Sequence, residues 1–511
     1  MLFITGFYAW PVITLLWSTA RSSGTSPFRH VREVLWFTTW QAVASTVLTM
    51  LVGLPPAYVL ARYTFRGRRA LLAVATVPFV LPTVVVGAAF LALLPQSWHG
   101  TAQAMIVAHV FFNIAVVVRL VGAMIAVIPH DLVGAARTLG ASTARSARVV
   151  LLPLLAPALW SAAAVIFLFC FTSFGVASLL GGPTHPTLEV EIARRATQLG
   201  DVGGAAALSV VQLGVLAVII AWTSRRQRRA AVELPGAAGS RRPRTRREQA
   251  FVGGVAVATV LAVGTPIAAL VSRSFDTGHG WSMSAWTKLG ATELRPGVGL
   301  GLDPLASIGA SLRFAIVAAL IASTIGFLAA AAINASPRAG KALDTGLMLP
   351  LGTSAVTIGL GMLITFDTSP FDWRARWWFI PLGHALVAVP FVVRSLLSVL
   401  RATPGDLRAA AATLGAAPVR AWWHVDARTL RRPLLAGAGF SAAISLGEFG
   451  ATTVLSRSGR ETVPIAIARL LGRSGALPRA QAFAMATILL ALTTVVVMAS
   501  ATRERLGSDD A

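Results

Sequence analysis

Charged side chains are scarce in this sequence. They make up 13% of its 511 residues, whereas about 25% is usual for a soluble globular domain. Hydrophobic residues make up 55% of the chain, and the mean hydropathy is +0.72. This balance excludes a water-soluble enzyme and a disordered chain. The single cysteine, Cys170, lies in an apolar stretch, which excludes a disulfide framework and a cysteine-based metal site.

Lysine is almost absent, since only Lys288 and Lys341 occur among the 44 basic residues. The ATP-binding P-loop has the pattern G-x-x-x-x-G-K-[ST]. Lys288 follows threonine and Lys341 precedes alanine, so neither fits that pattern. The zinc-binding pattern H-E-x-x-H is also missing, and no histidines are paired at ligand spacing. We therefore predict no catalytic residue, no metal site and no cofactor in this chain, and no ATP bound through a P-loop.

Long apolar runs are what the chain has in abundance. A helix needs about 20 predominantly apolar residues to cross the hydrocarbon core of a bilayer. Twelve stretches meet this requirement and predict an all-α membrane protein with about twelve transmembrane helices: 2–19, 34–60, 70–94, 102–128, 150–180, 203–222, 250–272, 308–333, 344–366, 377–400, 433–455 and 481–501.

The formal net charge is +24, and the basic residues are distributed according to the predicted spans. Arginines gather in the loops after the second, fourth, sixth and tenth stretches, while loop 95–101 has no charged residue. Short loops rich in Arg stay on the cytoplasmic side, so these loops and both termini are predicted to be cytoplasmic in a bacterial plasma membrane. Arg21, Arg29 and Arg32 do not follow the pattern. The positive charge thus indicates orientation in a lipid bilayer, and no nucleic-acid partner is predicted.

The second half of the chain repeats the first. Residues 131–141 read DLVGAARTLGA and residues 406–416 read DLRAAAATLGA, with eight of eleven positions identical at an offset of 275. The same offset aligns further pairs, among them His109 with His384 and Arg119 with Arg394. We infer two homologous parallel halves of about six spans each, residues 1–222 and 250–511. The Arg-rich segment 223–249 would join them as a solvated cytoplasmic linker.

The repeated segment predicts a short cytoplasmic helix in each half. Pro129 and Pro404 end the preceding helices, and Asp131 and Asp406 are suitable N-caps for a new one. Small residues would let a partner approach closely; they are Ala135, Ala136, Gly140, Ala410, Ala411 and Gly415. A single such helix could simply connect two spans. Its presence at matched positions in both halves favours docking to a cytoplasmic partner.

This segment resembles the coupling loop of bacterial ABC importer permeases, whose pattern is E-A-A, three residues, Gly, nine residues, I-x-L-P. The first copy, 131–153, fits with Gly in place of the Glu. The second copy, 406–433, has Ala in place of the Glu, fits up to Gly415 and then departs from the pattern. The resemblance implies the type I ABC importer permease fold. It also implies two cytoplasmic ATPase subunits that contact the two helices and an extracytoplasmic solute-binding protein.

Within that family the chain resembles the fused permeases for thiamine and for ferric iron. The segments that carry this resemblance are 170–174, 181–183 with 187–189, and 445–450. The solute expected from it is thiamine or ferric iron.

Two further groups of residues are candidates for contact with solute or partner. Glu448 lies near an apolar span and could attract a cationic solute, with Ser173 as its counterpart; Glu448 could equally be a boundary residue capped by its neighbours. His109 and His384 are expected to make structural hydrogen bonds. Segments 185–201, 273–307 and 460–480 are predicted to lie outside, where they could meet the solute-binding protein or simply connect spans.

A secondary transporter of the major facilitator type is the alternative, since that class also has 12 spans in two parallel halves. Residues 61–69, ARYTFRGRR, are similar to its loop after the second span. The aspartate expected before that arginine pattern is missing, and no membrane acid–base relay is evident. A membrane scaffold or polymer-synthesis enzyme has no catalytic signature to support it.

Overall fold

The structure is a computed structural model in which two compact units can be described. It describes residues 2–21, 28–182, 184–229, 239–278, 280–290, 293–295, 298–299, 303–367, 370–402, 406–417, 420, 422–457 and 459–505. The first-half unit comprises residues 27–190 and 211–273. The second-half unit comprises residues 1–26, 191–210 and 274–511. Each unit is described by itself.

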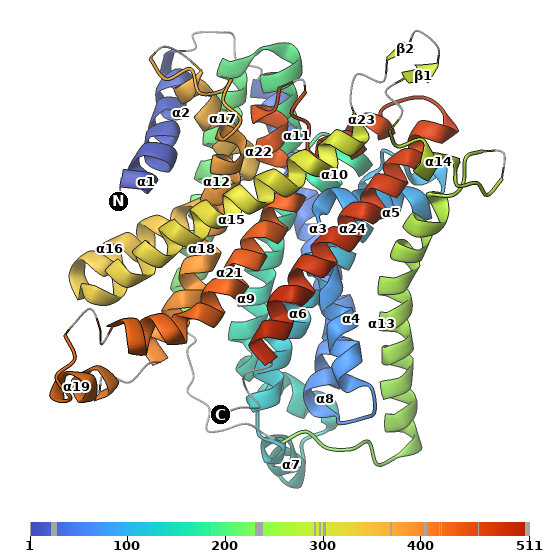
Figure 1. The fold of residues 1–511 in the computed structure, drawn as a ribbon. Coiled ribbons are helices and arrows are strands. Elements are labelled where there is room, and N and C mark those ends of the chain that lie inside the picture. The colour runs from blue at the N-terminus through green and yellow to red at the C-terminus, as the bar shows by residue number, and fades with distance from the viewer. Residues whose placement is uncertain are drawn as a thin grey trace. The chain divides into compact units, whose positions relative to one another are not determined.

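The first-half unit is a bundle of long helices (Figure 1). Its elements are α3 (Phe28–Arg62), α4 (Arg68–Val80), α5 (Thr83–Leu93), η2 (Gln96–Trp98), α6 (Ala102–Val127), α7 (His130–Thr138), α8 (Thr143–Ser146), η3 (Ala147–Leu151), α9 (Leu152–Phe171), α10 (Gly175–Leu180) and α13 (Arg246–Arg273). Helix α3 packs against α6 and α9, and α13 packs against α4 and α5. Helices α11 (Leu188–Arg194) and α12 (Val202–Arg229) contain the boundaries between the units.

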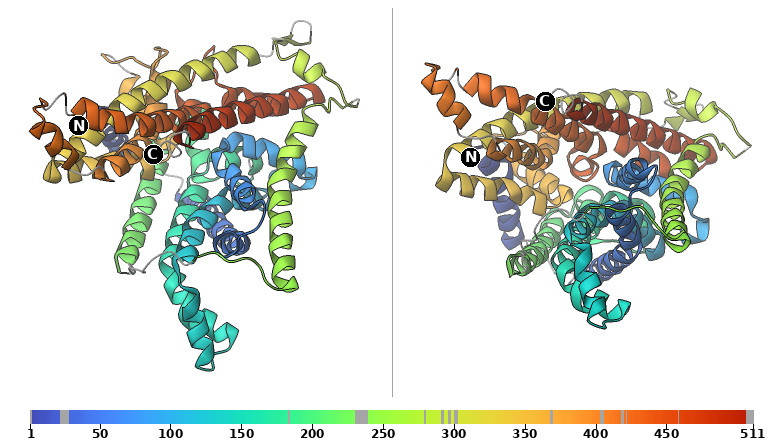
Figure 2. Two further views of the ribbon diagram at one scale, coloured as in Figure 1. Left: turned by 60° about the horizontal axis from the view of Figure 1, so that its bottom comes forward. Right: turned by 90° about the horizontal axis from the view of Figure 1, so that it is seen from below.

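The second-half unit is also helical. Its elements are α1 (Leu2–Ile4), η1 (Thr5–Ala9), α2 (Trp10–Arg21), η4 (Arg195–Leu199), α14 (Ser284–Thr287), α15 (Pro304–Ala335), α16 (Pro337–Met348), η5 (Leu349–Gly352), α17 (Ala355–Phe366), α18 (Phe379–Ala402), α19 (Asp406–Thr413), η6 (Trp423–Ala427), α21 (Arg428–Gly447), α22 (Gly450–Leu455), α23 (Val463–Leu471) and α24 (Ala476–Arg505). Helices α15, α18 and α21 pack on one another, and α24 lies along α21 (Figure 2). Strands β1 (Glu293–Arg295) and β2 (Val298–Gly299) form a small antiparallel hairpin.

The predicted membrane-spanning character is confirmed. Within the described residues, nine helices are long and apolar enough to cross a bilayer, or up to eleven when each of two bent pairs counts as one span. The nine are Leu2–Thr19, Val31–Arg62, Ala102–Val127, Ala144–Phe171, Val202–Thr223, Arg246–Arg273, Pro304–Ala335, Phe379–Ala402 and Ala476–Ser500. Each overlaps with a predicted stretch. Two predicted stretches are divided in the structure: 150–180 between α9 and α10, and 433–455 between α21 and α22.

The stretches 70–94 and 344–366 are not single straight helices as the hydropathy suggests. The first bends by 103° between Val80 and Thr83, and the second bends by 104° between Gly352 and Ala355. Leu81 precedes a proline and takes an extended conformation, which the proline ring favours. In the second pair the Ser354 side chain caps α17 by accepting from two backbone N–H groups. Hydropathy does not detect these breaks because the residues at both are still apolar on average.

The first helix of each predicted half packs with the helices of the other half's unit. Helix α2 packs against α17, and α13 packs against α5. The Tyr8 hydroxyl lies 2.6 Å from Thr353 Oγ1 in a buried hydrogen bond at the bend before α17. The units of the structure therefore do not follow the simple division of the chain into residues 1–222 and 250–511.

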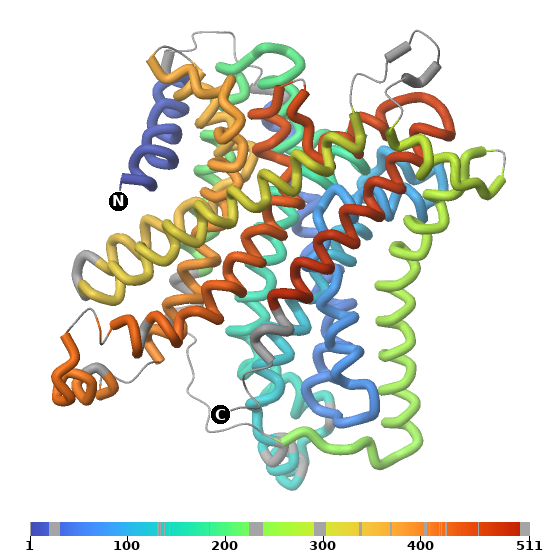
Figure 3. Tube along the Cα trace, in the orientation of Figure 1, coloured from blue at the N-terminus to red at the C-terminus, as the bar shows by residue number. Residues whose placement is uncertain are grey.

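The linker 223–249 also differs from a fully solvated tether. Its first residues continue helix α12 as far as Arg229. Residues 239–245 are extended and lead past the turn between α3 and α4 into α13 (Figure 3). An apolar cluster of Val59, Tyr63 and Val252 lies at the same place.

Candidate functional site

The first repeated segment forms a short helix that ends in a left-handed glycine. Helix α7 begins at His130, so Asp131 lies in its first turn rather than before it. Gly140 has φ +82°, and the N–H of Ala141 donates to the carbonyl of Ala136 at 3.0 Å. This pattern is the Schellman motif, in which glycine tolerates the left-handed backbone better than other residues. The chain then passes through α8 and η3 into α9.

The second repeated segment has the same geometry. Helix α19 begins at Asp406 itself, which places this carboxylate in the first turn. Gly415 has φ +79°, and the N–H of Ala416 donates to the carbonyl of Ala411 at 3.0 Å. The chain continues through the π-helical turn η6 into α21, as it continues through the π-helical turn η3 into α9 in the first half. The two segments that are similar in sequence thus also share their backbone conformation.

Both helices present a leucine to their surroundings just before the terminal glycine. Leu139 is 88% exposed and Leu414 is 87% exposed. Leu132 and Leu407, one helix length earlier, are also exposed, as are Ala135 and Ala410. Ala136 and Ala411 are half-buried. Each segment therefore carries a compact apolar face, and the exposed leucines extend the small-residue surface expected from the sequence.

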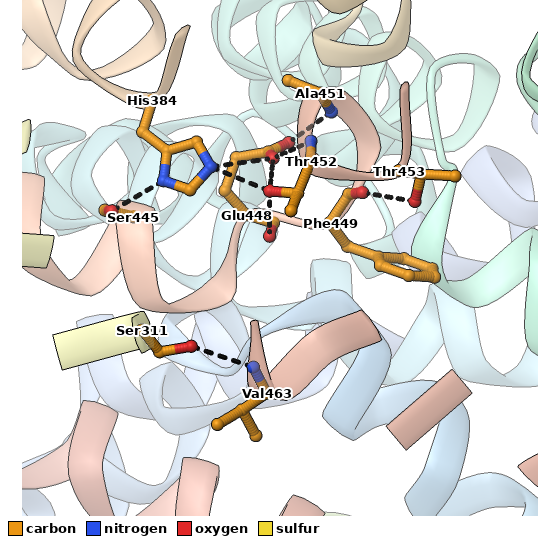
Figure 4. A network of polar contacts seen from close by, with 9 residues as sticks. All are labelled: Ser311, His384, Ser445, Glu448, Phe449, Ala451, Thr452, Thr453 and Val463. Atoms are coloured by element: carbon orange, nitrogen blue, oxygen red, sulfur yellow. Dashed lines mark hydrogen bonds and ion pairs between the residues drawn. The ribbon is translucent and has the colours of Figure 1, made fainter. Parts of the chain in front are cut away.

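Glu448 lies in a buried polar network at the junction of α21 and α22 (Figure 4). Its carboxylate accepts from the backbone N–H groups of Ala451 at 3.0 Å and Thr452 at 2.9 Å. The Thr452 hydroxyl donates to the same carboxylate at 2.9 Å. Glu448 thus satisfies backbone donors that the first turn of α22 would otherwise leave free. A capping role accounts for the burial of Glu448.

His384 completes this network. Its Nδ1 lies 2.8 Å from Ser445 Oγ, and its Nε2 lies 2.8 Å from Thr452 Oγ1 and 3.5 Å from a Glu448 carboxylate oxygen. Nearby, the N–H of Val463 donates to Ser311 Oγ at 2.9 Å, which joins the start of α23 to α15. The expectation of structural hydrogen bonds for His384 agrees with these contacts.

The matched position of the first half has a different chemistry. Ser173 is buried and precedes α10 as Glu448 precedes α22. His109 Nδ1 lies 3.3 Å from Ser45 Oγ, and the Asn113 side-chain amide donates to the His109 carbonyl. A serine stands in the first half where the second half has a carboxylate, so any role of Glu448 in binding a cation is confined to one half.

Two of the segments predicted to lie outside, 185–201 and 460–480, contain the short helices α11 and α23, whose apolar residues are mostly buried. In α11, Glu191 is buried and receives hydrogen bonds from Arg194 and Arg195, each 2.8 Å long at its shortest. Burial raises the pKa of Glu191, but the hydrogen bonds from Arg194 and Arg195 outweigh that effect and lower it below its ordinary value. In α23, Arg469 donates to Glu461 at 2.8 Å. Both helices therefore expose an arginine that is paired with a glutamate, Arg194 with Glu191 and Arg469 with Glu461.

Segment 274–290 holds the most exposed of the outer candidates. The Trp281 ring stacks on Phe275 at 6.2 Å between centroids, and Phe275 in turn stacks on Trp286. The N–H of Ser282 donates to the Phe275 carbonyl at 2.8 Å, which fixes the hairpin. Trp281 is 79% exposed on this hairpin. Asp303 has a different role, since its side chain accepts from Ala306 N and caps α15.

Comparisons with known proteins show similarity to transport permeases. Residues 49–232 match the family described as the binding-protein-dependent transport system inner membrane component. The chain is 27% identical over 505 residues to the thiamine transport system permease protein ThiP of Brucella suis biovar 1 (strain 1330), covering 93% of this chain and 89% of that protein. The ThiP of Escherichia coli (strain K12) is 24% identical over 468 residues, 87% of this chain and 84% of that protein.

A relative that is named for another solute aligns with less of the chain. The putative 2-aminoethylphosphonate transport system permease protein PhnV of Salmonella typhimurium (strain LT2) is 28% identical over 190 residues. That alignment includes 37% of this chain and 71% of PhnV. The similarity to ThiP, in contrast, extends through both halves.

Proposed function

We propose that this chain, which belongs to the family of binding-protein-dependent transport system inner membrane components, carries thiamine across the plasma membrane. It is the membrane-spanning permease subunit of an ABC importer, and its relatives are transport permeases rather than enzymes. The resemblance inferred from the repeated segment is thereby confirmed. The same comparisons favour this class over the major facilitator type.

Thiamine is proposed because several relatives that align with most of the chain are named for it. Thiamine carries a permanent positive charge on its thiazolium ring. Glu448 is a buried carboxylate in a unit of membrane-spanning helices, and such groups usually face a pathway or a partner. We assign Glu448, with Ser173 at the matched position, to the solute pathway. Ferric iron, the other solute expected from the sequence, has less support.

The single observation that carries the coupling mechanism is the matched geometry of α7 and α19. Each ends in a left-handed glycine, Gly140 or Gly415, directly after an exposed leucine. Two cytoplasmic ATPase subunits would each bind one of these helices. The leucine would fill a pocket of the ATPase, and the small residues would let the surfaces meet closely; these residues are Ala135, Ala136, Ala410 and Ala411, with Asp131 and Asp406 in the first turns.

ATP and its magnesium would bind to the ATPase subunits. Closure of the two ATPases on ATP would push on α7 and α19, and their helical continuations into α9 and α21 would carry the movement into each unit. A population shift between inward-open and outward-open states then requires only that the ATPases bind the two states with different affinity.

On the other side of the membrane, an extracytoplasmic solute-binding protein would deliver thiamine. The segment that carries the exposed Trp281 is the surface that we assign to this contact. We further propose that the Arg-rich loops and both termini lie in the cytoplasm, as the positive-inside rule predicts.

The test is ATP-dependent uptake of labelled thiamine into proteoliposomes that contain the chain, the ATPase and the solute-binding protein. We expect uptake that needs all three proteins and stops when ATP is omitted. Uptake by the chain alone that persists without ATP and collapses with a protonophore would instead establish a secondary transporter. ATP-dependent uptake of ferric iron but not thiamine would overturn the solute alone.

A further inference from the structure

The segment before α13 is fixed to the end of α3 by backbone hydrogen bonds. The N–H of Arg241 donates to the Arg62 carbonyl at 3.0 Å, and the N–H of Thr64 donates to the Arg241 carbonyl at 2.9 Å. Tyr63 and Arg241 thereby form an isolated parallel bridge. The pairing joins the linker between the halves to a turn that is more than 170 residues earlier in the chain. Figure 3 shows this segment passing into α13.

Side chains reinforce the pairing. The Arg241 guanidinium makes two hydrogen bonds to the Glu248 carboxylate, at 2.5 and 3.0 Å, and lies 5.1 Å above the ring of Tyr63. Bidentate arginine–carboxylate pairs and cation–π contacts of this kind are among the stronger polar interactions at a surface. Glu248 also accepts from the backbone N–H of Arg244 at 2.7 Å, which fixes the start of α13.

Arg62 connects this pairing to the first short helix. Its side chain is buried, and its Nη1 donates to the carbonyl of Ile128 at 2.7 Å. Ile128 caps the C-terminus of α6, and α7 begins two residues later at His130. The last carbonyls of a helix have no partner within the helix, and a cation there is favourable. The backbone carbonyl of Arg62 therefore accepts a hydrogen bond from the linker, and the side chain of Arg62 fixes the start of α7.

In the second half, ion pairs stabilise the end of α18, which precedes the short helix α19. Asp344 on α16 lies 3.3 Å from Arg394 and 3.6 Å from Arg401, which is in the last turn of α18 before α19. Both arginines are about half exposed. Exposed pairs of this kind contribute little to stability. The linker thus takes part in holding the first short helix, and a surface ion pair serves the second.

We propose that residues 239–248 form a latch that fixes the start of the first coupling helix, α7, through Arg62. Arg241 and Arg62 are then positioning residues for the coupling of ATP hydrolysis to transport in the first half. This inference rests on the proposed function of α7 as an ATPase contact. It assigns to the linker a task beyond joining the two halves.

The test is hydrogen–deuterium exchange on the full chain in lipid nanodiscs without the ATPase. In R241A and in R62M we expect amides of residues 128–141 to exchange about tenfold faster, because a hydrogen bond to a charged group is lost in each variant. Residues 406–416 of the second half should exchange as in the unaltered chain. The matched control is R242A, which removes the same charge from the neighbouring exposed arginine.

A charge exchange provides the second measurement. R241E alone should accelerate exchange in residues 128–141, and the double variant R241E/E248R should restore slow exchange. Unchanged exchange in both R241A and R62M would overturn the proposal. Equal acceleration in residues 128–141 and 406–416 would also overturn it, since it would indicate general destabilisation.

A functional measurement separates this inference from the proposed function. With the ATPase and solute-binding protein added, R241A should transport less than half as much thiamine per ATP hydrolysed, with ATPase binding retained. An unaltered chain that binds no ATPase would refute the proposed function, whatever the exchange data show. Normal coupling in R241A together with a functional unaltered chain would refute the latch alone.

Discussion

The Glu448 carboxylate accepts two hydrogen bonds from Thr452, one from its backbone N–H and one from its hydroxyl, each 2.9 Å long. This contact predicts different outcomes for two substitutions. E448A leaves buried N–H groups of α22 without an acceptor, which costs about 1 to 3 kcal/mol per group, and should lower the Tm of the purified chain. E448Q keeps an acceptor but removes the charge, so it should assemble.

If Glu448 also attracts thiamine, E448Q should raise the KM for uptake several-fold while thermal stability stays near that of the unaltered chain. The Ser173→Ala variant removes a hydroxyl but no charge from the other residue assigned to the pathway, so its KM should rise less than that of E448Q. If E448Q has the same KM as the unaltered chain, the only role of Glu448 is to cap α22.

The exposed leucines predict where the ATPase binds. L139D and L414D introduce a charge at side chains that the isolated chain leaves almost fully exposed, so folding and membrane insertion should be unaffected. Association with the ATPase should weaken about tenfold or more, since interface anchors of this size typically contribute over 1 kcal/mol. Copurification of the tagged ATPase measures this association.

Leu199 supplies a matched control, because it is exposed in η4 outside both short helices. L199D should leave ATPase association intact. Equal loss of association in L199D and L139D would mean that the leucines of the short helices have no special role.

The left-handed glycines predict a strict residue preference. Gly140 and Gly415 have positive φ, where a side chain with a Cβ costs about 1 to 2 kcal/mol. G140V and G415V should therefore unwind the ends of α7 and α19 and reduce thiamine-dependent ATP hydrolysis. G140N should be tolerated better, since asparagine also occurs at this cap.

Gly134 separates this backbone effect from a loss of the small-residue surface. It is exposed in the middle of α7, and its φ is not positive. G134A should be neutral or slightly stabilising, because alanine is the better helix former. A G134A variant as impaired as G140V would show that the size of the side chain decides the outcome, not the backbone conformation.

The pair of Glu191 with Arg195 predicts a pH dependence of stability. The folded state lowers the pKa of Glu191, so ionised Glu191 stabilises the fold at pH values above its unfolded pKa. This contribution is lost as the pH falls through the folded pKa. E191Q should lower the Tm by the same amount at pH 6 and pH 8, and breaking such a pair costs of the order of 3 kcal/mol.

Below the unfolded pKa of about 4 the difference between E191Q and the unaltered chain should shrink, because Glu191 then gains a proton first in the unfolded state, and the difference disappears as the pH falls through the lowered folded pKa. The measurement is thermal unfolding of the detergent-solubilised protein between pH 3.5 and 8. A difference that grows as the pH falls would have the wrong sign and would contradict the assignment.

The membrane spans and the repeat could be predicted from the sequence because both depend on residue type along the chain. Hydropathy detects Ala102–Val127 directly, and the offset of 275 finds Gly140 and Gly415 together. The bends at Leu81 and Thr353 could not be found this way, since the hydropathy averaged over each stretch stays high in spite of them. A proline at position 82 is a local signal for the first bend, but proline also occurs within helices, as Pro390 does in α18.

Contacts between segments that lie far apart in the chain could not be predicted from the sequence. Nothing in the letters around Arg241 identifies Tyr63 as its neighbour, and an Arg-rich linker is ordinarily solvated. Glu448 could be selected as a buried carboxylate, but its hydrogen bonds to Ala451 and Thr452 depend on the break between α21 and α22. Charge and hydropathy thus determine which residues enter the membrane, whereas tertiary packing determines which polar groups meet.

The packing of α2 against α17 has a consequence for how the protein is made. More than 330 residues separate the two helices in the chain, so α2 leaves the ribosome long before its neighbour has been synthesised. Until then the buried hydrogen bond of Tyr8 to Thr353 cannot form. Nascent chains that stop before residue 355 would carry α2 into the bilayer with its packing face turned to lipid. A membrane protease could recognise such an unfinished chain by that unpaired helix.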